Sequence, residues 1–126
     1  MDAQQEIENI DKKFQKELNA GISSLVLLSV LDKAEEQMYG YQIAKLVEDS
    51  QAGGSFIKLG TLYPVLRALE DNNLLRSEVE PSVTGPPRRY YRITQPGRET
   101  LKRWHKIWQQ TREMVAIHLE GAQNDK

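Results

Sequence analysis

Three consecutive stretches decide the fold of this chain: Leu74-Leu-Arg-Ser-Glu-Val-Glu80, Pro81-Ser-Val-Thr-Gly-Pro-Pro87 and Arg88-Arg-Tyr-Tyr-Arg-Ile-Thr94. The first and third have the length and residue types of β-strands, whereas the middle one holds three prolines and a glycine. Strand-like segments that are separated by turn-forming residues are typical of a hairpin. The sequence therefore predicts two strands, over residues 74–80 and 88–94, joined by a long and stiff loop.

Apolar residues upstream of this hairpin recur with the spacing of helices. Four of them predict an N-terminal amphipathic helix over residues 4–18: Ile7, Ile10, Phe14 and Leu18. Residues 22–31 are apolar on nearly every side, which indicates a short helix that is buried all round. Two further helices are predicted, over residues 41–49 and from Leu59 to about Asn73. The second is expected to end at Asn72-Asn73, because Asn tolerates the left-handed conformation at the end of a helix.

A long helix is predicted after the hairpin, over residues 96–120, with Pro96 at its start. Residues on one stripe of this helix recur every three or four positions and are mostly apolar: Leu101, Trp104, Trp108, Thr111, Val115 and His118. A mostly apolar stripe of this length is typical of an interface between helices. Residues 121–126 are predicted to be a disordered tail.

The order of these elements, short helices followed by a hairpin, is that of a winged helix. In this variant of the helix-turn-helix, the last helix before the hairpin enters the major groove of DNA. The expected fold class is mainly α, of the α+β type: a winged helix-turn-helix with a two-stranded wing, plus N-terminal and long C-terminal dimerisation helices. The expected parts are an N-terminal helix (1–20), a winged-helix DNA-binding domain (21–95) and a C-terminal dimerisation helix (96–120).

The net charge of the chain conceals a strong local imbalance. The 126 residues hold 17 Lys and Arg against 18 Asp and Glu, a net charge of -1, which by itself argues against a nucleic-acid partner. Residues 85–106, however, hold seven basic side chains against Glu99 alone, a local charge of +6, so the other 104 residues carry -7. This segment covers the second strand and the start of the last helix, which favours DNA binding.

Three motifs in this order resemble the PadR family of transcriptional regulators. They are Met38-Tyr39-Gly40-Tyr41-Gln42-Ile43, then Gly60-Thr-Leu-Tyr-Pro-Val-Leu-Arg-Ala-Leu-Glu70, then Gly85-Pro-Pro-Arg-Arg-Tyr-Tyr-Arg-Ile-Thr94 with Gly97 after it. The match runs from about Ile22 to Leu101. A single helix after the wing resembles the short C-terminal branch of the family, which implies that this helix builds a dimer. The chain departs from the family pattern in having Asn72-Asn73 where glycine is usual and in its added N-terminal helix.

Residues at the start of the predicted recognition helix and on the wing are the candidates for DNA contact: Tyr41, Gln42, Lys58, Thr61, Tyr63, Arg67, Arg88 and Arg89. The N-terminus of a helix attracts phosphate, and a Thr hydroxyl there both caps the helix and binds a phosphate oxygen. Pro64 is expected in the first turn, where its missing N–H matters little. For Tyr63 and Tyr41, packing against the rest of the fold is the alternative role.

Strand alternation places Arg88 and Arg89 on opposite faces of the wing. The two arginines are therefore not expected to act alike. One of them can anchor the fold by pairing with a carboxylate such as Glu70, while the other contacts phosphate or the minor groove; the sequence leaves open which.

Apolar residues on the first and last helices are candidates for dimerisation: Ile7, Ile10, Phe14, Leu101, Trp104, Trp108, Val115 and Leu119. The resemblance to short-branch PadR proteins adds an alternative role for Trp104 and Trp108, because a tryptophan on this helix can face its symmetry mate in the dimer and stack flat aromatic ligands. We therefore expect an effector site for planar aromatic compounds at Trp108, with Trp104 beside it.

Enzyme and metal-binding functions find no support in the sequence. The chain has no cysteine, no Gly-x-Ser-x-Gly motif and no phosphate-binding loop. His105 and His118 lie 13 residues apart on one predicted helix, which separates them by ~20 Å. We expect no catalytic residues, no metal and no cofactor. The longest apolar run is far too short to span a membrane, so a cytoplasmic location is expected.

These observations together predict a homodimeric transcriptional regulator, a repressor that binds a pseudo-palindromic double-stranded DNA operator and is released by a planar aromatic effector. Two alternatives stay open. A winged helix can also act as a protein-interaction module without specific DNA binding, although the local charge of +6 argues for DNA. A dimer that sequesters aromatic ligands without operator preference is the third reading.

Overall fold

The computed structural model describes residues 2–49 and 59–124, and within them it contains four helices and one small antiparallel sheet. The elements in chain order are α1 (Ala3–Lys33), β1 (Met38–Tyr39), α2 (Gly40–Asp49), α3 (Leu59–Asp71), β2 (Leu75–Glu80), β3 (Arg88–Ile93) and α4 (Gln95–Asn124). Helices α2 and α3 followed by the β2–β3 hairpin form the predicted winged helix-turn-helix, in which the hairpin is the wing.

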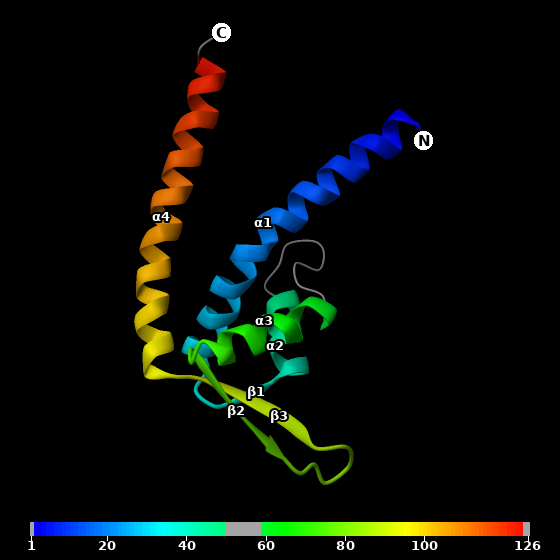
Figure 1. Cartoon of the computed structure of the whole chain (residues 1–126), viewed down its shortest axis with the longest axis vertical. Helices are drawn as coiled ribbons and strands as arrows, with labels where there is room; N and C mark the ends of the chain where they lie inside the picture. The colour runs from blue at the N-terminus through cyan, green and yellow to red at the C-terminus, as the bar shows by residue number, and fades with distance from the viewer. Residues whose placement is uncertain (1, 50–58, 125–126) are drawn as a thin grey trace.

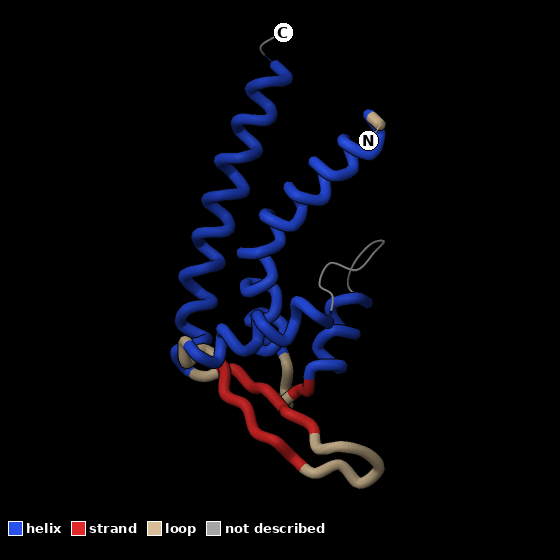
Figure 2. Tube along the Cα trace, turned by 45° about the vertical axis from the view of Figure 1, so that its right-hand side comes forward, coloured by secondary structure: helices blue, strands red, loops and turns tan. Residues whose placement is uncertain are grey.

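The helices and the wing extend from the core in opposite directions. In Figure 1 the N-terminal half of α1 and most of α4 rise from the core toward the top, whereas the β2–β3 hairpin projects toward the bottom. Figure 2 shows the same separation from a second direction, with the strands below and the two long helices above. The molecule therefore presents a wing at one end and two helix ends at the other.

The sheet has one more strand than the sequence predicts. Its order is β1-β3-β2, and every pairing is antiparallel. Met38 and Tyr39 form the added strand by pairing with Tyr91 and Tyr90, so the first sequence motif is tied directly to the wing. Two residues are too few for an alternating pattern of polarity, which is why this strand escaped prediction.

Helix α1 is a single helix where the sequence predicts two. It runs without interruption through Asn19 and Gly21, and the side-chain hydroxyl of Ser23 donates a hydrogen bond to the carbonyl of Asn19 at 2.6 Å. Asp2 caps its first turn by accepting from the N–H of Gln5 at 2.7 Å. A glycine weakens a helix by only ~0.5–1 kcal/mol, too little to end one whose two halves are each well formed.

The ends of α3 and α4 are settled by local contacts. Asn73 adopts a positive φ of 63°, and its N–H bonds the carbonyl of Glu70 at 2.9 Å, so the predicted left-handed Asn at the end of α3 is confirmed. Helix α4 begins at Gln95, capped by Thr94, and extends to Asn124. Residues 121–124 are therefore helical, and the prediction of a disordered tail is wrong for them.

The hydrophobic core lies where α1, α2, α3 and the sheet meet. Its fully buried members come from every one of these elements: Leu27, Leu28, Ile43, Leu62, Leu66 and Leu75. Tyr91 and Ile93 face this core from β3, which defines the inner face of the sheet. Among the described residues no helix combines the length and the hydropathy needed to cross a membrane.

Gly97 is predicted to be intolerant of any side chain. A Cβ at this position would lie 2.2 Å from the carbonyl oxygen of Leu74 and 2.8 Å from Cγ1 of Ile93. Because one obstacle is backbone, Gly97→Ala is expected to lower the free energy of unfolding by ~1–3 kcal/mol in urea denaturation. The matched control is Gly21→Ala, where a Cβ would meet nothing within 4 Å, and which is expected to stabilise the helix. Equal stability of the two variants would contradict the packing.

Candidate nucleic-acid interface

Helix α3 has a buried face of leucines and an exposed face of mixed chemistry. Leu62, Leu66 and Leu69 point into the core, and the exposed face carries Thr61, Tyr63, Pro64, Arg67 and Ala68. Pro64 is the sixth residue of the helix, not part of the first turn as predicted, so it removes the helical hydrogen bond that the carbonyl of Gly60 would accept.

Tyr63 both packs and remains accessible. A Cβ on Gly40 would lie 2.5 Å from Cε1 and 2.6 Å from the hydroxyl oxygen of Tyr63, so the ring rests on the glycine that opens α2. Tyr63 is nevertheless 43% exposed to solvent. The contact explains why the first motif contains a glycine: a larger residue would push Tyr63 out of its place on α3.

The two α2 candidates differ in what they do. The side-chain oxygen of Gln42 accepts a hydrogen bond from the N–H of Tyr39 at 3.1 Å, which satisfies a donor at the start of the helix. Gln42 thus has a structural role that the sequence did not predict. Tyr41 beside it is 57% exposed. Lys58, the remaining candidate before α3, lies outside the described residues.

The two wing arginines lie on opposite faces, as predicted. Arg88 is on the outer face, where its guanidinium sits 4.4 Å from the centre of the Tyr39 ring, and that ring meets Tyr90 edge-on at 5.5 Å. Arg89 is on the inner face, which is turned toward α3. Its Nη1 donates to the hydroxyl of Ser77 at 3.0 Å.

A short polar chain links Arg89 to α3. The Ser77 hydroxyl, which accepts from Arg89, donates in turn to a carboxylate oxygen of Glu70. Arg89 is therefore the arginine that is anchored toward Glu70, through a serine and not by a direct ion pair. Ser77 pairs with Tyr91 in the strand register and therefore lies on the same face as Arg89. Strand alternation was the signal in the sequence from which this role of Ser77 could have been predicted.

Tyr91 marks the point where the recognition helix and the wing converge. Burial raises the pKa of its phenol; the positive charge of Arg89 opposes this rise, the carboxylate of Glu70 adds to it, Tyr63 adds a little and Arg67 opposes it. The phenol is therefore neutral at physiological pH. Three predicted residues, Tyr63, Arg67 and Arg89, are therefore near enough to Tyr91 to act on its phenol electrostatically.

The basic residues of the +6 segment are divided between the wing and α4. Arg88, Arg89 and Arg92 belong to β3, whereas the other four lie on α4, which leads away from the wing: Arg98, Lys102, Arg103 and Lys106 (Figure 1). Arg98 pairs with Asp32 at 3.5 Å, and Arg103 donates to the hydroxyl of Thr100 at 2.8 Å. Two of the four basic residues on α4 are therefore engaged by groups of the protein itself.

The predicted dimerisation residues lie on α1 and α4, mostly uncovered. Leu101 and Trp104 pack partly against the core, and the other six are exposed: Ile7, Ile10, Phe14, Trp108, Val115 and Leu119. Trp104 and Trp108 line an apolar groove of about 570 Å³ between the two helices, together with Leu18, Ile22 and Ile107. The two candidate effector-binding residues, Trp104 and Trp108, therefore line the same groove.

In the described ranges 2–49 and 59–124, no three His, Asp or Glu side chains are grouped so as to hold a metal ion. The site is thus built from hydrogen-bonding, cationic and aromatic groups, which suit the recognition of a phosphate backbone and base edges.

Comparison with known proteins identifies this architecture. A model of the "Transcriptional regulator PadR-like family" matches residues 27–103, well over half of the chain. The chain belongs to the PadR-like family. The resemblance read from the three motifs is confirmed, and with it the winged-helix fold. PadR proteins are DNA-binding transcription regulators and not enzymes.

Solved PadR structures share most of the chain. The crystal structure of a PadR family regulator from Eggerthella lenta is 32% identical, with a TM-score of 0.76 over 92% of this chain and 97% of that one. A PadR regulator from Clostridium difficile is 29% identical, with a TM-score of 0.63 over 76% of this chain and 96% of that one. An uncharacterised protein of Lysinibacillus sphaericus is 30% identical over 79% of this chain and 89% of its own.

Proposed function

We propose that this PadR protein is a homodimeric repressor that binds a pseudo-palindromic operator through α3 and the wing of each subunit. The observation that carries the proposal is the convergence of Tyr63 and Arg67 on α3 with Arg89 on the wing. Two elements that are distant in sequence present hydrogen-bond donors to the same space, as a groove-binding surface requires. Thr61, at the exposed start of α3, adds a hydroxyl for a backbone phosphate.

The two wing arginines have different parts in this proposal. Arg89 combines the two roles that the sequence divides between the arginines: Ser77 anchors it, and its position facing α3 allows it to contact the backbone of the groove that α3 enters. Arg88 is turned to the outer face and held against Tyr39, so its contribution to DNA affinity is smaller. Tyr41, exposed at the start of α2, completes the surface by contacting the neighbouring phosphates.

Dimerisation uses the end of the molecule opposite the wing. The exposed apolar residues of α1 and α4 lie on helix segments that extend beyond the core, where a second copy of the chain can cover them: Ile7, Ile10, Phe14, Val115 and Leu119. Residues 1–20 and 96–120 supply the interface. A two-fold axis between the subunits then sets the two wings about one turn of DNA apart.

The groove between α1 and α4 is the proposed effector site. Its lining of Trp104, Trp108, Ile107 and Leu18 is apolar, and its volume of about 570 Å³ accommodates a flat aromatic compound. Because the same two helices build the dimer, a ligand wedged between them changes the spacing of the wings and releases the operator.

The DNA surface is tested by single replacements on the wing. Arg89→Ala is expected to weaken operator binding about tenfold and to lower the slope of log affinity against log salt by about 1, because one phosphate contact is lost. Arg88→Ala is expected to weaken binding less. Arg112→Ala, with the same loss of charge in the second half of α4, is the control. Gel shifts at several salt concentrations measure all three, and unchanged affinity for Arg89→Ala would favour a protein-interaction module.

The effector site is tested by tryptophan fluorescence. Titration with planar aromatic compounds is expected to give a saturable change in emission, because stacking alters the surroundings of the indole. Trp108→Phe should remove most of this change while the protein still dimerises. A panel of such compounds that leaves the emission of the parent protein unchanged would refute the site.

A further inference from the structure

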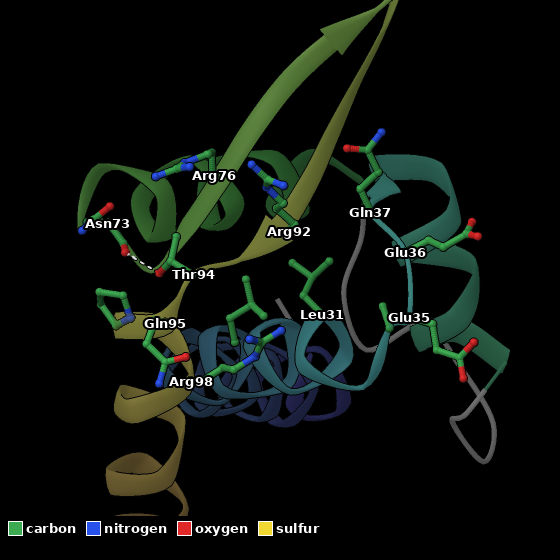
Figure 3. Close-up of a pocket in the computed structure, with 13 residues that line it drawn as sticks. Leu31, Glu35, Glu36, Gln37, Asn73, Arg76, Arg92, Thr94, Gln95 and Arg98 are labelled. Carbon is green, nitrogen blue, oxygen red and sulfur yellow. Dashed lines mark hydrogen bonds between the residues drawn. The ribbon is translucent and has the colours of Figure 1, made fainter.

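A polar pocket lies at the base of the wing, away from the groove of the tryptophans. It has a volume of about 680 Å³ and is formed by the C-terminal end of α1, the outer face of the sheet and the first turn of α4. Figure 3 shows its lining, with Arg76 and Arg92 contributed by the sheet, Arg98 by α4, and Glu35 and Glu36 by the segment after α1. No residue of the proposed DNA surface lines it.

Two of its arginines are placed unfavourably for the stability of the sheet. Arg76 on β2 and Arg92 on β3 are direct partners in the strand register, so both side chains stand on the outer face side by side. Like charges directly opposite on neighbouring strands repel. An anion between them converts this repulsion into attraction.

The guanidinium groups of Arg92 and Arg98 form only long ion pairs with carboxylates of the protein. Arg92 approaches Glu78 at 3.8 Å, and Arg98 approaches Asp32 through Nε at 3.5 Å. Both distances exceed the 2.7–2.9 Å, approximately, of a charge-assisted hydrogen bond. Arg76 forms no ion pair with any residue of the described ranges. The planar donor forks of all three are thus available to an oxygen-rich ligand, which guanidinium binds in bidentate fashion.

Thr94, which lines the pocket near the arginines, is held in place by two hydrogen bonds. The Thr94 hydroxyl donates to the carbonyl of Asn73 at 2.7 Å, drawn as a dashed line in Figure 3, and accepts from the N–H of Gly97 at 3.0 Å. Across the pocket, Glu35 and Glu36 bring negative charge to the rim. These carboxylates repel an extended polyanion such as DNA but leave room for a small one that sits among the arginines.

We propose that this pocket binds a small multivalent oxyanion, a phosphorylated metabolite, that bridges Arg76 and Arg92 of the sheet to Arg98 of α4. Such a ligand ties the wing to the dimerisation helix. Its regulatory effect rests on the proposed function: by restraining the wing relative to α4, the bound anion changes the affinity for the operator. The site is chemically and spatially distinct from the apolar groove of Trp104 and Trp108.

Calorimetric titration of the full chain with pyrophosphate, at constant ionic strength, tests the site. We expect saturable binding of one pyrophosphate per subunit. Arg76→Ala and Arg98→Ala are each expected to weaken it at least about tenfold, since each removes charge-assisted hydrogen bonds to the anion. Arg98→Lys should restore part of the affinity. Lys106→Ala, an equal loss of charge on the exposed face of α4 outside the pocket, should bind as the parent does.

Three results would overturn the proposal. Heat that does not saturate, or that is equal in all variants, means that phosphate only screens charge. Loss of operator affinity by Arg76→Ala without pyrophosphate means that these arginines bind DNA phosphates instead. Operator affinity that stays unchanged at saturating pyrophosphate contradicts the regulatory link. A parent protein that binds no operator refutes the proposed function, whereas the calorimetric result still decides the site.

Discussion

The burial of one leucine face at the end of α1 holds the rest of the structure together. Leu27, Leu28 and Leu31 are 0–2% exposed and pack where α3, β3 and the start of α4 meet. Truncating one such leucine typically costs ~2–5 kcal/mol, a large part of the stability of a domain this small. Because this face contacts both the recognition helix and the wing strand, it also fixes the angle between them. The convergence of Tyr63, Arg67 and Arg89 follows from that angle.

The same helix leaves its other half uncovered. α1 is continuous from Ala3 to Lys33, yet only its second half enters the core, and the apolar residues of its first half are exposed. The free ends of α1 and α4 diverge from each other (Figure 1). One continuous helix thus connects the core of the winged helix to the end that we assign to dimerisation. In our proposals, ligands that bind between α1 and α4, or between the sheet and α4, act on the wings through these helices.

The sequence predicts the elements with strong periodicity and misses those set by tertiary contact. The leucines of α3 and the alternation of β3 give correct elements, and Asn73 correctly marks the end of α3. The break at Gly21 was wrong, because a single glycine lowers helix stability without stopping a helix that is held from both sides. The strand at Met38 exists only because β3 provides its partner. The roles of Gln42 and Ser77 likewise depend on atoms that are distant in the chain or set by the fold.

The distribution of charge in the fold also could not be predicted from the order of residues alone. A count along the chain unites the arginines of the wing with the basic residues of α4. In the fold, Arg92 and Arg98 line one pocket, and Arg76, which lies outside the counted segment, joins them through strand pairing with Arg92. Linear proximity predicted a basic segment correctly. Which of its residues face DNA, and which line a pocket, is decided by the sheet.

Symmetric binding through α3 and the wing is tested by hydroxyl-radical footprinting of an operator that is selected from fragments of the source genome. Two subunits that each place α3 and a wing on DNA predict two protected patches on each strand, related by a two-fold axis and about one helical turn apart. A single protected patch, or uniform protection without sequence preference, would contradict a symmetric dimer that reads its operator through α3 and the wing.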